Sequence, residues 1–380
     1  MSGGALAGLR IIEMVGIGPA PFAAMMLADH GAEVIRVHAL NARSDIPLMN
    51  TKFDVLARAR RSLAIDLKTE AGVATLLDLV AGADGMLEGF RPGVMERLGL
   101  GPAACLARNP RLAYGRMTGW GQDGPLALTA GHDLNYVALT GTLHAMGPAG
   151  SPPPVPLNLV GDFGGGGMLL AFGMLAALLS ARSSGRGQVV DAAMTDGAAL
   201  LSAMIWGFRA GGVWSDTREA NLLDGGAWFY GTYVCADGRY IAIAPIEPKF
   251  NAALLQRLGL DPADWPQDDK ALWPLLRARL AAHLTTRPRD DWAALFAGTD
   301  ACVSPVLDWA EAPADPHNAA RGTFIQVDGV TQPGPAPRFD TTPAPIPAPP
   351  PKPGSHSAAI LESWGIDPAR IGFLKENGII

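Results

Sequence analysis

Short apolar runs alternate with amphipathic segments along the first half of the chain. An apolar run at residues 9–14 is followed by a Gly-Pro turn, an Ala/Met-rich segment at 20–28 and a second apolar run at 31–37. A strand, a helix and a strand in this order predict a βαβ unit, because parallel strands need a crossover connection. The same alternation predicts further strands at 63–67, 85–89 and 112–116, and a helix at 69–80. The pattern favours an α/β fold with a doubly wound domain.

The second half changes character near residue 225. Residues 230–244 alternate around Asp237-Gly238, which predicts a hairpin. Helical periodicity follows at 248–258, 272–284 and 290–296, so a smaller α+β domain is expected. Residues 333–353 are rich in Pro, Ala and Gly and predict an extended connector. The pattern therefore predicts a large domain in the first half of the chain and a smaller domain that begins near residue 225.

Composition narrows the classes of function. The 380 residues carry a net charge of −6, and the sequence has no long run of Lys and Arg. Nucleic acid is therefore not expected as a partner. The three cysteines are far apart in the sequence, so neither a disulfide framework nor a metal site is expected. No basic segment followed by an apolar one marks the N-terminus, and the longest apolar run, 168–179, is too short to span a bilayer. These features predict a soluble, cytoplasmic protein with no membrane span.

The turn Gly16-Ile17-Gly18 invites comparison with dinucleotide-binding loops. Pro19 follows it, the third glycine of that motif is missing, and His38 stands where an acidic residue is needed after the second strand. An ordinary turn is the better interpretation.

Candidate catalytic side chains lie in two nearby segments. Gly131-His132-Asp133 supplies an imidazole and a carboxylate, and Asp162 follows about thirty residues later, before a Gly-rich loop at 164–167 and an apolar helix. An imidazole and a carboxylate suit proton transfer on two faces of a carbon atom. Backbone N–H groups at 162–164 would face an anion at the helix start, and the glycines would let a substrate approach. The simpler alternatives are that Asp162 only caps the helix, that His132 is a loop residue and that the glycines only pack helices.

Several segments together resemble the family III CoA-transferase (CaiB/BaiF) superfamily. They are ADHGAEVIRV at 28–37, RRSLAIDLK at 60–68, EGFRPGVMERLGLG at 88–101 and TGWGQDGP at 118–125. Within that superfamily, GHDLNY at 131–136, the block around Asp162 and IEPKF at 246–250 resemble the α-methylacyl-CoA racemase branch. The resemblance runs from about residue 9 to about residue 339, with the motifs in the same order.

The resemblance implies a Rossmann-like large domain at 1–200, a linker at 201–224, a small domain at 225–318, and a return linker with the rest of the large domain at 319–380. It also implies an interlocked homodimer with each active site between the large domain of one chain and the small domain of the other. It implies interconversion of (2R)- and (2S)-2-methylacyl-CoA thioesters through an enolate. His132 would face the S centre and Asp162 the R centre. Glu247 would hydrogen-bond His132, and Asn158 would hydrogen-bond Asp162 or the thioester. Asp133 would contact these residues without touching the substrate.

The resemblance also assigns coenzyme A to the large domain. Five arginines are candidate contacts to its adenine and phosphates: Arg36, Arg58, Arg60, Arg61 and Arg91. A planar guanidinium donates two hydrogen bonds at once to a phosphate. Because coenzyme A is part of the substrate, no separate cofactor and no metal are expected.

Two other functions are compatible with parts of this pattern. In a CoA-transferase, Asp162 would be a covalent nucleophile that attacks the thioester. A non-catalytic acyl-CoA-binding protein would need none of these groups. His132 and Glu247 favour the racemase, because transfer has no use for that pair. The acyl chain and the role of His38 stay open.

Overall fold

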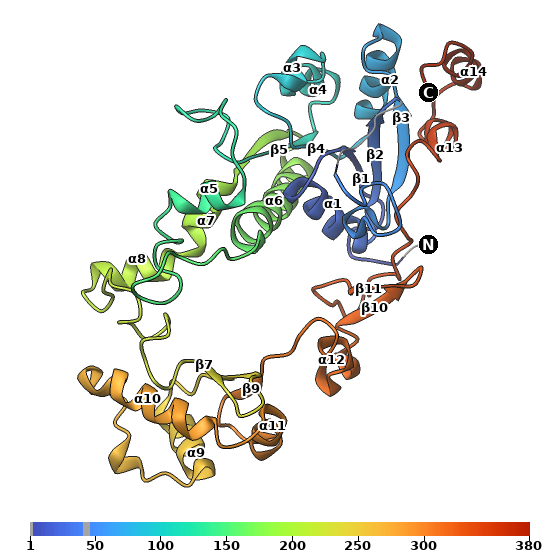
Figure 1. Cartoon of the computed structure of the whole chain (residues 1–380). Coiled ribbons are helices and arrows are strands. Elements are labelled where there is room, and N and C mark those ends of the chain that lie inside the picture. Colours follow the sequence, from blue (N-terminus) through green and yellow to red (C-terminus); the bar gives the residue numbers. More distant parts are fainter. Residues whose placement is uncertain (1–2, 41–45) are drawn as a thin grey trace. The chain divides into compact units, whose positions relative to one another are not determined.

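The computed structural model describes residues 3–40 and 46–380, and the chain divides into two compact units (Figure 1). The first unit comprises residues 1–140, 156–201 and 321–380, and the second comprises 141–155 and 202–320. The second unit thus includes residues 141–155, which lie within the predicted large domain, and the segment predicted as a linker. Helix α8 (Ala203–Ala210) forms within that segment.

A six-stranded parallel sheet organises the first unit, which confirms the predicted α/β class. Its order is β3-β2-β1-β4-β5-β6. The strands are β1 (Arg10–Met14), β2 (Glu33–Ala39), β3 (Arg61–Ile65), β4 (Gly85–Glu88), β5 (Ala113–Thr118) and β6 (Gln188–Ala193). The order reverses direction between β1 and β4, and ligands in such sheets bind beyond the carboxyl ends of the strands at this switch point.

Helices cover both faces of this sheet, and a separate core fills each side. One core contains Ile12, Ile35 and Leu63, and the other contains Ile11, Val34 and Leu87, because successive side chains of a strand point to opposite faces. The helical elements of the unit are α1 (Pro19–Asp29), η1 (Val55–Ala57), α2 (Glu70–Ala81), α3 (Val94–Arg97), α4 (Pro102–Arg108), α5 (Asp133–Ala138), η2 (Leu159–Met168), α6 (Leu169–Ser184), α7 (Met194–Leu201), α13 (Ser357–Ser363) and α14 (Pro368–Glu376). A two-stranded hairpin, β10 (Phe324–Val327) and β11 (Val330–Pro333), precedes the connector.

The Gly-rich segment is helical, and the predicted loop at 164–167 is wrong. Element η2 is a π-helix that runs directly into α6. A β-carbon on Gly165 would lie 2.6 Å from the backbone nitrogen of Ala198, and one on Gly167 would lie 2.6 Å from the ring of Phe22. These glycines therefore allow η2 to pack closely against α7 and α1, and Gly165–Gly167 act in helix packing rather than in substrate approach.

The continuous helix Leu159–Ser184 also corrects the length estimate made from the apolar run. It spans 26 residues and is long and apolar enough to cross a membrane by length and composition, and 44% of its apolar stretch is buried. The helix gains this length because η2 adds ten residues before α6. The core helix of a soluble protein passes the same test, so this is weak evidence of a span.

The second unit is an α+β structure with its own core. Its sheet has the order β7-β8-β9, and the hairpin β7–β8 confirms the prediction around Asp237. Aromatic side chains such as Trp228, Trp273 and Trp292 fill the core. Besides α8, its elements are β7 (Gly231–Val234), β8 (Tyr240–Ile243), α9 (Pro248–Leu258), η3 (Pro262–Asp264), η4 (Lys270–Leu272), α10 (Trp273–Leu284), α11 (Arg289–Phe296), β9 (Val303–Pro305) and η5 (Ala312–Ala314); α12 (Pro316–Arg321) lies at its boundary with the first unit.

Candidate active site

Asp162 lies at the switch point of the large sheet. A β-carbon on Gly18, in the turn between β1 and α1, would lie 3.3 Å from Oδ2 of Asp162. Gly18 has a φ of 67°, a left-handed conformation that glycine adopts without strain. The turn that the sequence suggested for a dinucleotide therefore faces the carboxylate of Asp162, and glycine leaves room for it.

The hydrogen bonds of Asp162 come from the two segments that the sequence singled out. Its backbone N–H donates to Oδ1 of Asp133 at 2.7 Å. Nδ2 of Asn158 donates to its Oδ2 at 3.2 Å. Asp162 lies inside the first turns of η2, whose N-cap position is occupied by Asn158, so the expectation that Asp162 precedes or caps the helix is wrong. The structure thus brings Asp133, Asn158 and Asp162 into direct contact.

The environment of Asp162 makes its carboxyl a better base near neutral pH than an ordinary aspartate. Partial burial raises its pKa, and the nearby carboxylate of Asp133 raises it further. The hydrogen bond from Asn158 and the charge of His132 act in the opposite direction. His132 immediately precedes Asp133, so the hydrogen bond between Asp162 and Asp133 brings the segments that carry the imidazole and the carboxylate together.

The peptide around His132 is held by side chains of α5, which begins one residue later. The backbone N–H of His132 donates to Oδ1 of Asn135 at 3.0 Å. The hydroxyl of Tyr136 donates to the carbonyl oxygen of Gly131. The imidazole itself is exposed to solvent. The backbone on both sides of this side chain is fixed, while its ring remains accessible.

Tyr136 is a site residue that the sequence reasoning quoted in a motif but gave no role. A β-carbon on Gly119 would lie 2.1 Å from its ring, so the glycine after β5 makes room for it. Trp120 contacts the ring edge to face, with centroids 4.7 Å apart. Burial raises the pKa of Tyr136, the charge of Asp162 raises it further and that of Arg91 lowers it. The signal in the sequence was an aromatic residue four positions after His132, one helical turn away.

The backbone N–H groups expected to face an anion at 162–164 are partly committed. That of Asp162 bonds to Asp133, and that of Phe163 donates to the carbonyl oxygen of Asn158 at 3.4 Å. In a π-helix each N–H donates five residues back, so the Gly164 N–H is directed into the helix as well. The N–H groups that lack an acceptor in their own helix are therefore the first ones of η2, before Asp162, and the first ones of α5.

Three of the five predicted arginine contacts are buried in ion pairs. Arg58 makes a bidentate pair with Asp29, at 3.0 and 2.6 Å. Nε of Arg60 donates to Glu13 at 3.0 Å, and Nη1 of Arg36 donates to Asp54 at 3.1 Å. Because these guanidinium groups are enclosed and already paired, they are structural in this fold and are not available to a phosphate.

The other two arginines differ in position. Arg61 is half-buried at the amino end of β3 and donates to Glu33 at 2.8 Å. Arg91 is exposed in the loop after β4, at the carboxyl edge of the sheet, and its charge reaches Tyr136. Arg91 is therefore the exposed candidate at the carboxyl edge of the sheet.

Glu247 belongs to the second unit. It is exposed at the N-cap of α9, where its carbonyl oxygen accepts from the backbone N–H groups of Phe250 and Asn251 at 3.0 Å. Its assignment to His132 stays a prediction.

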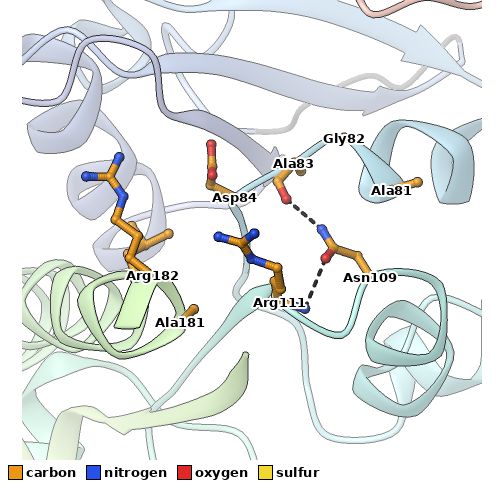
Figure 2. A pocket seen from close by; sticks show the side chains of 9 residues that line it. Ala81, Gly82, Ala83, Asp84, Asn109, Arg111, Ala181 and Arg182 are labelled. Atoms are coloured by element: carbon orange, nitrogen blue, oxygen red, sulfur yellow. Dashed lines mark hydrogen bonds between the residues drawn. The ribbon is translucent and has the colours of Figure 1, made fainter. Parts of the chain in front are cut away.

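A pocket of about 220 Å³ in the first unit lies at the opposite end of the strands (Figure 2). Asp84 and Arg111 line it just before β4 and β5, and Asn109 bridges the carbonyl oxygen of Ala83 and the backbone of Arg111. None of the predicted site residues lines this pocket. It is therefore separate from the switch-point site.

Comparisons with known proteins identify the family to which the chain is similar. The family model described as CoA-transferase family III matches residues 6–357. The chain is 44% identical to an α-methylacyl-CoA racemase of Mus musculus and 42% identical to one of Homo sapiens, in each case over 99% of this chain and 97% of the relative. Among solved structures, a CaiB/BaiF family protein from Brucella suis superposes with a TM-score of 0.82 at 26% identity and covers 96% of this chain and 100% of that one.

Proposed function

The chain belongs to CoA-transferase family III, and from this premise we propose that it is a racemase of 2-methylacyl-CoA thioesters. The observation that carries the proposal is the hydrogen bond that joins the His132-Asp133 segment to a partly buried Asp162 at the switch point of the sheet. The identity to two proteins named α-methylacyl-CoA racemase supports the same reaction.

The proposed reaction moves one proton at C2. With the R substrate, the carboxylate of Asp162 removes the C2 proton, and the electron pair of the broken C–H bond forms the enolate. The imidazolium of His132 then gives its proton to the opposite face of C2, which yields the S product. Asp162 is left protonated and His132 neutral, so the enzyme is ready for the reverse reaction.

The surrounding groups have supporting roles in this proposal. Asp133 holds the backbone of Asp162 and, by its charge, keeps the pKa of that carboxyl raised. Asn158 orients one carboxylate oxygen. The enolate oxygen would be stabilised by the first backbone N–H groups of η2 and α5, and one such donor is typically worth about 10²–10³ in turnover. Glu247 would hydrogen-bond His132 and set its tautomer.

Coenzyme A would be held through Arg91. Its exposed guanidinium stands beyond β4, and the buried pairs of Arg36, Arg58 and Arg60 leave it as the best-placed phosphate contact. A proton transfer moves no electrons out of the substrate, so no separate cofactor is included. All three cysteines are free thiols, which supports a reducing, cytoplasmic compartment.

A homodimer is also part of the proposal, supported by an exposed apolar stripe that begins at the last residue of η2 and continues along α6. Met168, Phe172, Leu175 and Leu179 are each at least 40% exposed and recur every three or four residues. No charged residue occurs between Phe163 and Ala181. Such a stripe indicates an interface, and a second copy of the chain would cover it.

Incubation of one pure enantiomer of a 2-methylacyl-CoA with the protein tests this function. Conversion to the other enantiomer supports racemisation. Transfer of coenzyme A to an added carboxylic acid, with the configuration retained, would instead support a CoA-transferase with Asp162 as nucleophile.

A further inference from the structure

A cavity of about 750 Å³ opens in the second unit, and none of the residues assigned above lines it. One flank of α10 forms a wall of this cavity. Residues 232–234 of β7 and the segment around residues 217–226 complete the lining. On this flank α10 presents Ala278, Ala281 and Ala282, whereas Leu276, Leu280 and Leu284 are buried in the core. Small side chains here leave the space open, and its volume is in the range of small-molecule sites.

Arg277 is the charged side chain of α10 in this wall, and its guanidinium is held in place. It lies over the ring of Tyr233, 5.1 Å from the centroid. A β-carbon on Gly231 would lie 2.6 Å from its Nη1, so the glycine leaves room for the guanidinium in this position. The cation is therefore positioned by the fold before any ligand arrives.

No anion neutralises this guanidinium within the described part of the chain. Its Nη1 is buried without a hydrogen-bond acceptor, and no ion pair to Arg277 is present among the described residues. The other charged groups of the wall are committed: Glu219 accepts from the backbone N–H of Ala149 at 2.7 Å, and Arg218 donates to the carbonyl oxygens of Met146 and Ser151. A guanidinium keeps its charge, so the site has one unmatched positive charge beside an apolar wall.

We propose that this cavity binds a small amphipathic carboxylate, with the carboxylate on Arg277 and the hydrocarbon part along the alanine flank of α10. A carboxylate matches the planar fork of a guanidinium. The apolar wall excludes a purely polar anion as the best ligand, because such an anion would leave the alanines without a partner. The proposal does not depend on the racemase reaction.

Binding of hexanoate to the full-length protein tests the site. Isothermal titration calorimetry would compare the wild type with Arg277→Gln and, as a matched control, Arg279→Gln. Arg279 lies on the same helix but over Trp265, outside the cavity. We expect Arg277→Gln to weaken hexanoate binding about tenfold or more, since a hydrogen bond to a charged group is lost, and Arg279→Gln to leave it unchanged.

A second variant tests the apolar wall without touching the charge. Ala281→Leu places a bulky side chain on the alanine flank and should weaken hexanoate binding while the melting temperature stays near that of the wild type. Hexanamide, which lacks the charge, and inorganic phosphate, which lacks the apolar part, should both bind far more weakly than hexanoate. Hexanoate binding that survives Arg277→Gln, equal binding of phosphate, or no hexanoate binding to the wild type would each overturn the proposal.

Discussion

The backbone N–H of Asp162 donates a 2.7 Å hydrogen bond to the buried carboxylate of Asp133. This bond joins the first residue of α5 to η2 and so couples the two segments that carry the proposed acid and base. Asp133 also raises the pKa of the Asp162 carboxyl by its charge. Position and protonation of Asp162 therefore depend on the same neighbour.

Asp133→Asn removes that charge and should lower the pKa of Asp162. Since the carboxylate form of Asp162 removes the proton of the R substrate, the acidic limb of the pH profile of kcat/KM for that substrate should move to lower pH. Asp133→Ala also removes the hydrogen-bond acceptor, and we expect turnover to fall about 10²-fold through misplacement of Asp162. Asp123→Asn, which removes an exposed charge, is the control. An acidic limb that moves to higher pH in Asp133→Asn would contradict the account.

Removal of one partner from the buried pair Arg58–Asp29 should cost stability rather than coenzyme A binding. Arg58 also donates to Gln332 at 2.8 Å and to the carbonyl oxygen of Pro333, so the pair ties α1 to the returning chain. Arg58→Ala leaves a buried carboxylate unpaired, and the free energy of unfolding should fall by about 3–5 kcal/mol in urea titrations. Arg209→Ala, which breaks the exposed pair with Asp216, should leave stability unchanged. A stable Arg58→Ala protein with weakened coenzyme A binding would instead restore the ligand role.

His38 should make stability depend on pH. Burial, followed by the charge of Arg36, lowers its pKa from 6.5 to about 4, and Asp54 opposes this only in part. Because the pKa in the folded state lies below the unfolded value, the contribution is complete above pH 6.5 and is lost as the pH falls toward 4. The loss amounts to about 3 kcal/mol at most.

The measurement is the free energy of unfolding between pH 7 and pH 4.5 for the wild type and His38→Gln. The wild type should lose more stability over this range than His38→Gln, and the exposed His317→Gln should behave like the wild type. Equal slopes for all three proteins would show that His38 does not titrate in this way.

The apolar stripe of α6 should be a subunit interface. We expect light scattering coupled to gel filtration to give twice the mass of one chain for the wild type and a smaller mass for Phe172→Lys, since a charge at the centre of the stripe cannot be desolvated without cost. Ile346→Lys changes an exposed apolar residue on the connector and should leave the mass unchanged. A wild type of single-chain mass would contradict the proposed dimer.

Much of the large sheet could be predicted because its strands are continuous apolar runs buried on both faces, as residues 9–14 and 31–37 show. The helix that contains Asp162 could not. Four successive glycines normally disfavour a helix, and here contacts to Ala198 and Phe22, distant in sequence, outweigh that preference. Local propensity does not contain such contacts.

The site residues divide in the same way. His132, Asp133, Asn158 and Asp162 could be named from their motifs, and the structure brings the last three into hydrogen-bonding contact. The sequence could not separate structural arginines from candidate ligand contacts, because a buried Arg58 paired with Asp29 and an exposed Arg91 look alike in a sequence. The partner of each charge is set by the tertiary fold.

The central claim is that His132 and Asp162 exchange the C2 proton of a thioester from opposite faces. The most direct measurement is incubation of one enantiomer of a 2-methylacyl-CoA in D2O, with configuration and deuterium at C2 followed together. The account predicts inversion with deuterium entry in the wild type, reduced by about 10²–10⁴ in Asp162→Ala and His132→Ala. Inversion at an undiminished rate in either variant, or no deuterium entry in the wild type, would contradict it.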